Sequence, residues 1–309
     1  MTFKRLCKGK WEHHEHISIE ESKWADMCNN GGLMYCKKGI SDSYGYDGKA
    51  FYPSILASDD FKIPCKQGKE IILEKLPIKQ ADVKCGYYKV RITCDNANFT
   101  KIFSFSQHHV YTHLSIRQAM MYKKMFNVSI ELIQNGKPNA YIYDDSCLIS
   151  CSDIFGSWYD TLNKLKSQYP KNKLVKHLLS SIWGHLSRTN KTTKTYDEII
   201  SQKLDIGRTE KAEYLIEDHH IFPDKEYYVL VNRHNPYKFP LRLKSFITSY
   251  GRNHISQVAL LDIDNVIRIQ TDGIIFNKPT TMIDERFIAE DKTTGKMDWQ
   301  HVNKGIKLE

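Results

Sequence analysis

The feature that most constrains this chain is a short polar sequence, Gln270-Thr271-Asp272-Gly273, enclosed by two largely apolar runs, Val266–Ile269 and Ile274–Phe276. Short runs rich in β-branched residues on both sides of a glycine-containing turn are typical of an antiparallel hairpin. Such a hairpin belongs to a sheet and holds Asp272 at one end of it. We therefore expect the chain to fold around an antiparallel sheet that presents a carboxylate at its edge.

A second carboxylate, Asp47, is placed for the same chemistry. The run from Ser43 to Ile55 alternates enough to predict a strand that enters a turn at Pro53 and carries Asp47 at the edge of the sheet. Two divalent cations held about 3.5–4 Å apart can activate an attacking oxygen and a leaving phosphate, and they need carboxylates from distant segments. Asp47 and Asp272 are candidates for such a pair.

Two helical stripes lie between these carboxylates. Apolar residues recur at helical spacing over 154–168 and again over 173–186, with Pro170 between them, which predicts an antiparallel helical hairpin. Lys164 and Lys176 each lie six residues from Pro170 and can approach one another across such a pair. Two close ammonium groups repel unless an anion lies between them, although lysines on helix surfaces are usually just solvated.

These three segments, in this order and at this spacing, resemble motifs A, B and C of family B DNA polymerases. The resemblance is greatest to the protein-primed branch of small phages, linear organellar plasmids and some DNA viruses, and it extends from Asn29 to about Trp299. Motif A of that family is Asp, three variable residues, a bulky apolar residue, Tyr, Pro and Ser. Its residues in this chain are Asp47, Phe51, Tyr52, Pro53 and Ser54.

The other two motifs depart from the family pattern at single positions. Motif B keeps Lys176, Ser181 and Gly184, but has Ser180 in place of Asn and Trp183 in place of Tyr. Motif C of the family is Asp-Thr-Asp-Ser, and here Gln270 replaces the first Asp. In the family the second Asp, here Asp272, is the direct metal ligand, so the change weakens the negative potential without removing a principal ligand.

The resemblance implies an α+β fold: a polymerase palm, an antiparallel sheet with packed helices, plus helical-hairpin fingers. It divides the chain into a polar segment 1–28, a first palm part 29–152 with motif A and an insertion, fingers 153–188, a second insertion 189–244, and a second palm part 245–309 that stops before a thumb. An exonuclease domain is absent from this division.

The resemblance also implies site residues. Asp47, Asp272 and the Gly48 backbone would hold two Mg²⁺ ions, for which Mn²⁺ can substitute, with Gln270 and Thr271 behind them. The nucleotide would contact Phe51, Tyr52, Lys164, Lys176, Ser181 and Trp183, with Tyr52 as the steric gate against a ribose 2′ hydroxyl. DNA would contact Gly31, Gly32, Gly184, Lys296 and Trp299.

The implied function is template-directed DNA synthesis, with transfer from a dNTP to a primer 3′ hydroxyl or a protein-primer hydroxyl, by a partial or split polymerase. Its partners would be primer-template DNA, dNTP, and a terminal protein or a separate exonuclease or thumb polypeptide. Two alternatives stay open: a catalytically inactive descendant that binds DNA or a replication partner, and the product of a broken reading frame.

Composition adds weaker constraints. With 45 basic and 36 acidic residues the net charge is +9, which favours a polyanionic partner. The eight cysteines form no Cys-x-x-Cys pair, so we expect reduced, mostly buried thiols. His13-His14-Glu15-His16 lacks zinc-ligand spacing and fits a solvated segment better. No apolar run reaches about 18 residues, and a charged start predicts a soluble intracellular protein without a signal peptide.

Overall fold

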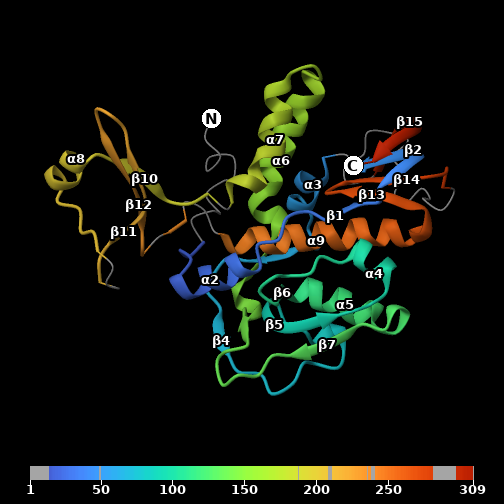
Figure 1. Cartoon of the computed structure of the whole chain (residues 1–309), viewed down its shortest axis with the longest axis horizontal. Helices are drawn as coiled ribbons and strands as arrows, with labels where there is room; N and C mark the ends of the chain where they lie inside the picture. The colour runs from blue at the N-terminus through green and yellow to red at the C-terminus, as the bar shows by residue number, and fades with distance from the viewer. Residues whose placement is uncertain are drawn as a thin grey trace.

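The structure is a computed structural model that describes residues 14–48, 50–186, 188–207, 211–234, 236–237, 241–280 and, for the backbone alone, 297–308. It combines helices with sheets whose named strands pair antiparallel throughout (Figure 1). The mixed α and antiparallel β composition confirms the predicted α+β class.

The predicted hairpin lies inside a five-stranded sheet. Strands β13 and β14 are its two arms, and β14 pairs in turn with β2, so that Gly273 lies opposite Asp47. The order across the sheet is β1-β13-β14-β2-β15. The strand bounds are β1 Met34–Cys36, β2 Gly39–Gly48, β13 Val266–Gln270, β14 Gly273–Phe276 and β15 Met297–Leu308.

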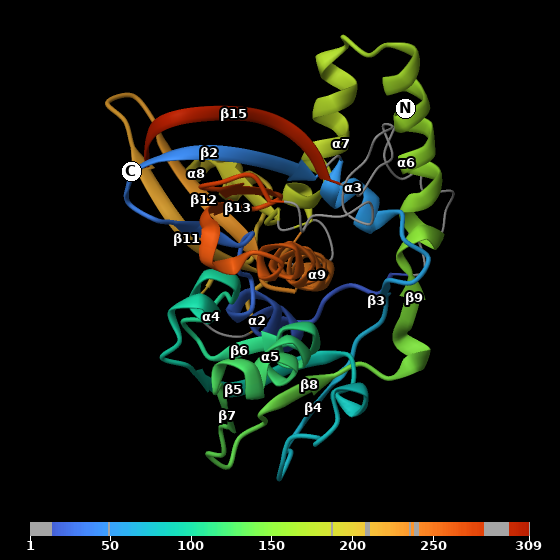
Figure 2. The same cartoon turned by 90° about the vertical axis from the view of Figure 1, so that its right-hand side faces the viewer.

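Helix α9 (Leu241–Leu260) runs beneath this sheet and lies at the centre of the molecule (Figures 1 and 2). Its first half, including Phe246 and Ile247, belongs to a core shared with the helical hairpin, and its second half, including Ile255 and Val258, belongs to a core shared with the sheet. A helix buried on most of its surface is apolar on more than one face. The sequence pattern predicts a helix from Phe246 to Leu261, and the helix itself begins five residues earlier, at Leu241.

A second sheet lies on the other side of α9 (Figure 1). Its order is β4-β8-β5-β6, and β7 pairs with β5. Helix α5 (His113–Phe126) packs between this sheet and α9, and helix α4 (Ala97–Ile102) packs against α9 and β1. The strand bounds are β4 Lys69–Ile71, β5 Gly86–Thr93, β6 Val110–Thr112, β7 Ser129–Leu132 and β8 Ala140–Ile142.

The sequence pattern over 113–126 predicts a helix, which is confirmed, and the pattern over 85–110 predicts strands, which is wrong in part. Helix α4 interrupts this run, because the Asn96 side chain accepts hydrogen bonds from the backbone N–H groups of Asn98 and Phe99 and so caps a helix start. Burial of Phe99 and Ile102 then fixes the short helix against the core.

The helical hairpin is present. Helices α6 (Cys151–Gln168) and α7 (Lys173–His185) lie side by side and stand upright above α9 (Figure 2). Both contact the short helix α3 (Phe51–Leu56) at their base. A two-stranded pair, β3 (Lys62–Pro64) with β9 (Leu148–Ser150), leads into α6.

The strand predicted from Ser43 to Ile55 ends earlier than the sequence pattern indicated. Strand β2 ends at Gly48, Ala50 has the left-handed φ of 47°, and α3 follows, so Pro53 lies inside a helix rather than at a turn. Proline is tolerated there because the first N–H groups of a helix have no partner within the helix. The chain thus changes direction immediately after Asp47.

A third sheet, β10-β12-β11, extends to one side with helix α8 (Figure 1). The sequence of Tyr227–Val231 predicts a strand, and this strand is confirmed because it lies within β12. The bounds are β10 Lys191–Lys194, α8 Tyr196–Ser201, β11 Tyr214–Ile221 and β12 Glu226–Asn232. Single 3₁₀ turns are η2 Gln80–Asp82, η3 Asp145–Cys147 and η4 Ile263–Asn265.

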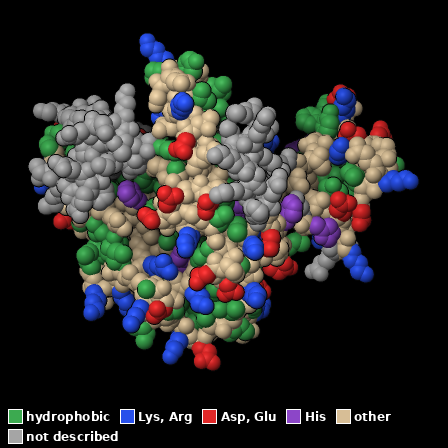
Figure 3. All heavy atoms as spheres, turned by 180° about the vertical axis from the view of Figure 1, so that it is seen from behind, with side chains coloured by type: hydrophobic (Ala, Val, Ile, Leu, Met, Phe, Trp, Pro, Cys, Tyr) green, Lys and Arg blue, Asp and Glu red, His purple; other side chains and the backbone are tan. Residues whose placement is uncertain are grey.

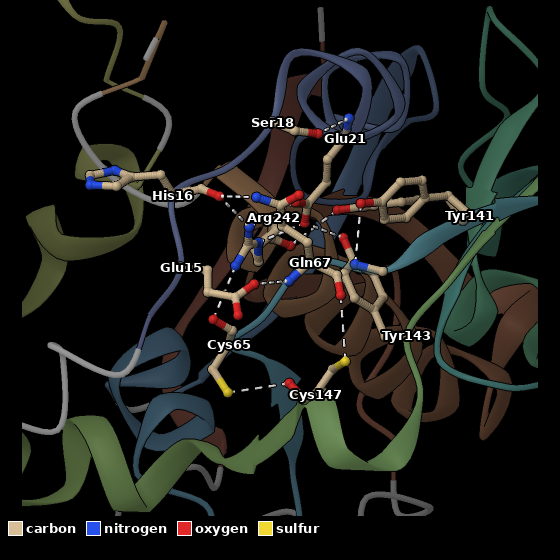
Figure 4. Close-up of polar contacts among 12 residues, drawn as sticks. Glu15, His16, Ser18, Glu21, Cys65, Gln67, Tyr141, Tyr143, Cys147 and Arg242 are labelled. Carbon is tan, nitrogen blue, oxygen red and sulfur yellow. Dashed lines mark hydrogen bonds and ion pairs between the residues drawn. The ribbon is translucent and has the colours of Figure 1, made fainter. Parts of the chain in front are cut away.

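The N-terminal segment, polar in sequence, contains a packed helix that the sequence analysis did not predict. Helix α2 (Ile19–Met27) buries Glu21, whose carboxylate forms a bidentate ion pair with the Arg242 guanidinium, at 2.6 Å from Nε and 2.7 Å from Nη2. Figure 4 shows the same guanidinium donating to the carbonyls of Cys65 and His16, while Tyr143 donates to Glu21. This cluster joins α2, the end of β3, the segment after β8 and the start of α9.

Seven cysteines lie in the described part of the chain, and all are free thiols. Four of them, Cys28, Cys65, Cys85 and Cys151, are buried, as expected for reduced core thiols. Burial raises the pKa of Cys28 to about 12, so its thiol stays protonated at neutral pH. Within the described ranges, the helices are too short or too polar to cross a bilayer.

We predict that Glu21→Gln destabilises the fold by about 3–5 kcal/mol, because it leaves the Arg242 guanidinium buried without a counter-charge. Urea unfolding of the purified chain measures this change. Glu20→Gln, on the exposed neighbouring residue of the same helix, is the matched control and should leave the unfolding free energy unchanged. Equal, small effects of both changes would contradict a structural role for the ion pair.

Candidate functional site

Strand pairing brings the two candidate carboxylates together. Asp47, the penultimate residue of β2, lies opposite Gly273, the residue after Asp272, and the Gly48 N–H donates to the Asp272 carbonyl at 2.9 Å. A Cβ atom on Gly273 would lie 3.3 Å from Asp47 Oδ1, so the Asp47 carboxylate lies over this glycine. The two carboxylates therefore share one end of the sheet, although they are 225 residues apart in the chain.

The turn that carries Asp272 is held from behind by the Asn29–Leu33 segment. Thr271 has the left-handed φ of 60°, and its N–H donates to the Leu33 carbonyl at 2.8 Å. A Cβ on Gly32 would lie 2.7 Å from the Thr271 side chain, so only glycine fits. The buried Arg252 guanidinium of α9 donates to the Gly31 carbonyl at 2.6 Å and to the Asn30 carbonyl at 3.1 Å. Helix α9 therefore fixes the segment that fixes the turn.

A cavity of about 670 Å³ lies between this sheet end, α3 and the helical hairpin. A volume of this size is typical of small-molecule sites. The predicted site residues that line it are Asp47, Gly48, Phe51, Tyr52, Lys176, Gln270, Thr271 and Asp272. Lys164, Ser181, Gly31, Gly32 and Gly184 are not part of this lining.

Tyr52 is buried at the wall of the cavity. Its ring and that of Phe51 meet at 5.4 Å between centroids, and both fit against α9 because residue 251 is glycine: a Cβ there would lie 3.0 Å from Phe51 and 3.1 Å from Tyr52. Burial raises the pKa of the Tyr52 hydroxyl to about 12, with Arg252 acting in the opposite direction and Asp272 raising it further. The phenol is therefore neutral at physiological pH.

The hairpin contributes a different second lysine from the one that the sequence indicated. Lys166 lines the cavity with Lys176, whereas Lys164 is exposed on another face of α6. Residues two positions apart on a helix are rotated by about 200° relative to each other, so Lys164 and Lys166 cannot share a face. Lys166 lies four residues after the buried Leu162, and that spacing was the signal available in the sequence.

On α7, too, the residue that lines the cavity differs from the predicted one. Ser180 lines the cavity, whereas Ser181 is exposed beside it. Ser180 follows Lys176 by four residues, and its hydroxyl donates to the Lys176 carbonyl at 3.1 Å. The helical period again explains the difference.

Arg268 is a further cation at the cavity, and the sequence analysis missed it. It is half-buried on β13, two residues before Gln270, and strand alternation places both on the same face. Among the described residues, the salt bridges do not involve Arg268, Lys166 or Lys176. On the described part of the face in Figure 3, by contrast, basic and acidic side chains are intermixed.

The donor set fits magnesium better than zinc. Magnesium is commonly held by one or two carboxylates, several waters and substrate phosphates, and Asp47 and Asp272 supply two carboxylates. Burial raises the pKa of Asp272, which marks a carboxylate whose charge is poorly solvated and would be stabilised by a cation. Over the described ranges, no cluster of three or more His, Cys, Asp or Glu residues surrounds a common point.

Several predicted positions lie outside what the structure describes. Lys296 is beyond the described ranges, as is the Trp183 side chain. Trp299 is described only through its backbone, which lies opposite Tyr46 in the β15–β2 pair. At the N-terminus, the Glu15 and His16 side chains are exposed, but His14 is half-buried and the Glu15 N–H and His16 carbonyl bond to Cys65 and Arg242, so the expected solvated segment is partly packed against the fold.

We predict that Asp272→Asn raises the melting temperature at pH 7.5 by about 2–4 °C. Because burial raises the pKa of Asp272, the protonated form stabilises the fold below the unfolded-state pKa, and this contribution is lost as the pH rises through the folded-state pKa. The ionised carboxylate is therefore unfavourable at neutral pH, and a neutral amide relieves it. Asp42→Asn, at an exposed position on β2 of the same sheet, is the control. A lower melting temperature for Asp272→Asn would contradict this account.

Comparison with solved structures places the fold. Phi29 DNA polymerase complexed with primer-template DNA and incoming nucleotide substrates matches with a TM-score of 0.63, at 14% identity, over 98% of this chain and 51% of that chain. The same polymerase with single-stranded DNA matches with a TM-score of 0.63 at 13% identity. The chain thus spans about half the length of these structures. No protein-family model and no curated protein matches the sequence. The chain is therefore a mixed α/β protein similar in fold to a DNA polymerase domain.

Proposed function

We propose that this chain carries out template-directed DNA synthesis, transferring a nucleotide from a dNTP to a primer 3′ hydroxyl or to a protein-primer hydroxyl. It would act as the palm and fingers of a protein-primed, family B-like polymerase. The observation that carries the proposal is the meeting of Asp47 and Asp272 at one sheet end, facing a cavity whose opposite wall supplies Lys166 and Lys176. Carboxylates for metals and cations for phosphates are the two requirements of nucleotidyl transfer.

The fold supports the same proposal. The solved structures that resemble the chain are of a polymerase with primer-template DNA and with incoming nucleotides. In this proposal the five-stranded sheet and α9 form the palm, and α6 with α7 forms the fingers. The second sheet falls within the first palm part, 29–152, which is expected to contain an insertion, and the β10-β12-β11 sheet falls within the expected second insertion, 189–244. A terminal protein, or a separate exonuclease or thumb polypeptide, would complete the assembly.

Asp47 and Asp272, with the Gly48 backbone, would hold two Mg²⁺ ions, or Mn²⁺ in their place. When bound, such ions lower the pKa of the attacking hydroxyl and neutralise charge on the leaving pyrophosphate. Gln270 lies opposite Gly273 and keeps a polar oxygen there without a charge. The site therefore attracts metal less strongly than one with three carboxylates.

The protein side chains would position the nucleotide. Lys166 and Lys176 neutralise phosphate charge from the hairpin side, in place of the Lys164 and Lys176 pair expected from the sequence. The Tyr52 ring, fixed against α9, occupies space beside Asp272 where a ribose 2′ hydroxyl would lie. Phe51 supports that ring from within the same helix.

We predict that Asp47→Asn and Asp272→Asn each lower primer extension by about 10²–10³-fold or more, because each removes a charged group at the reacting centre. The assay is primer extension with Mg²⁺ and, separately, with Mn²⁺, at equal folded fraction by circular dichroism. Asp42→Asn is the control variant. Extension by either site variant at the wild-type rate would exclude this pair as the metal site.

The same assay separates the proposal from its alternative. Gln270 favours a descendant that binds DNA without catalysis, since it removes one acidic residue of the family motif. Such a protein would bind primer-template but show no extension in its wild-type form with either metal. Extension that Asp272→Asn abolishes would contradict the inactive descendant.

We predict that Lys166→Gln lowers dNTP affinity by about tenfold and that Lys164→Gln leaves it unchanged, since a hydrogen bond to a charged group contributes about 1.5–3 kcal/mol. The two residues lie on the same helix and differ in which face they occupy. Titration calorimetry with a dNTP and Ca²⁺, which avoids turnover, measures both. Equal losses would indicate a general basic surface instead of a triphosphate site.

A further inference from the structure

Strand register arranges the floor of the cavity as two rows. The first row crosses the sheet through Gln270, Gly273 and Asp47, which lie opposite one another on β13, β14 and β2. The second row, two residues further along each strand, runs through Arg268, Ile275 and Gly45. Two residues of a strand span about 7 Å, so Arg268 lies that far along the sheet from the first row.

Cations therefore lie on both sides of the carboxylates. Lys166 and Lys176 line the cavity from the helical hairpin, beyond the end of the sheet, whereas Arg268 lines it from the sheet itself. Between Arg268 and Asp47 the floor is neutral: Gly45 has no side chain and Ile275 is apolar. A single anion bound by Lys166 and Lys176 would be separated from Arg268 by the first row, which contains Asp47.

The residues around Arg268 position its side chain to contact a ligand in the cavity. Its neighbours Ile267 and Ile269 are buried on the opposite face of β13, which fixes the strand and directs residue 268 to the cavity face. The residue as a whole is half-buried, and no described carboxylate pairs with its guanidinium. A partly desolvated guanidinium beside a neutral floor favours a phosphate oxygen, with which it can form two parallel hydrogen bonds.

We propose that Arg268 binds a backbone phosphate of the primer strand close to its 3′ end. The inference rests on the proposed function, in which the dNTP occupies the lysine side. The primer strand then enters from the Arg268 side, and its last sugar lies on the neutral floor at Gly45 and Ile275. Its 3′ hydroxyl reaches Asp47 and Asp272 at the end of the sheet. One nucleotide unit is long enough to cover the separation between the two rows.

The experiment is a double-mutant cycle between Arg268 and the phosphate. Primer-template affinity is measured by fluorescence anisotropy in Ca²⁺, for the wild type and for Arg268→Gln, with primers whose last two linkages are either phosphodiester or uncharged methylphosphonate. We expect each single change to weaken binding by about tenfold, and the two together to weaken it no further. Arg268→Gln should also lower the slope of log affinity against log salt by about 1.

Matched variants complete the test. Arg268→Lys keeps the charge and should retain part of the affinity, which guards against a loss caused by misfolding, and melting temperatures check the fold. Lys166→Gln should lower dNTP affinity but should not change the loss of primer-template affinity caused by the methylphosphonates. Methylphosphonates at the 5′ end of the primer should not change the loss of primer-template affinity caused by Arg268→Gln. Arg268→Gln should not change dNTP affinity.

The outcomes separate this inference from the proposed function. Additive losses from Arg268→Gln and the methylphosphonates, or a loss of dNTP affinity on Arg268→Gln, would overturn the primer contact even if the chain extends primers. Non-additive losses without any primer extension would support the contact and leave the chain a DNA-binding descendant. Failure of the folded wild type to bind primer-template would overturn the inference outright.

Discussion

The buried pair between Glu21 and Arg242 is the interaction on which the arrangement of this fold depends. A guanidinium that is fully removed from solvent requires a counter-charge, and here it also requires the carbonyls of Cys65 and His16. These groups come from three separated segments, so their requirements can be met only when the segments have assembled around the start of α9. Removing either partner leaves an uncompensated buried charge, which is more costly than the net gain from forming the pair.

Helix α9 connects the Glu21–Arg242 pair to the site. Arg252, three turns after Arg242, holds the Asn30–Gly31 carbonyls, and the adjoining Gly32 and Leu33 hold the strained Thr271 turn that presents Asp272. The same helix gives Phe51 and Tyr52 their place at Gly251. Both carboxylate-bearing segments are therefore supported by one helix, which keeps their relative position fixed while the cavity face stays open.

The cavity contains both a carboxylate that favours a cation and basic side chains that favour an anion. Asp272 is partly desolvated, which raises its pKa and makes its charge available to a cation, while three basic side chains surround the same space. Gln270 is uncharged, and with Arg268 two residues before it the balance at the sheet end shifts toward anions. In the proposed function, a site with this balance would suit phosphates on both sides of the two metal ions.

The sequence by itself determined the hairpin around Asp272 and the helical hairpin with its apolar stripes, because each depends on local periodicity and turn residues, whereas the α+β class was implied only by the resemblance. The sequence could also pair Asp47 with Asp272 through a resemblance, but only the register of β14 with β2 decides that they meet. Tertiary structure alone decided that Lys166 rather than Lys164 faces the cavity, that Pro53 lies in a helix, and that Arg268 belongs to the site. Those outcomes depend on which helix face packs inward and which strands lie adjacent, and distant segments fix both.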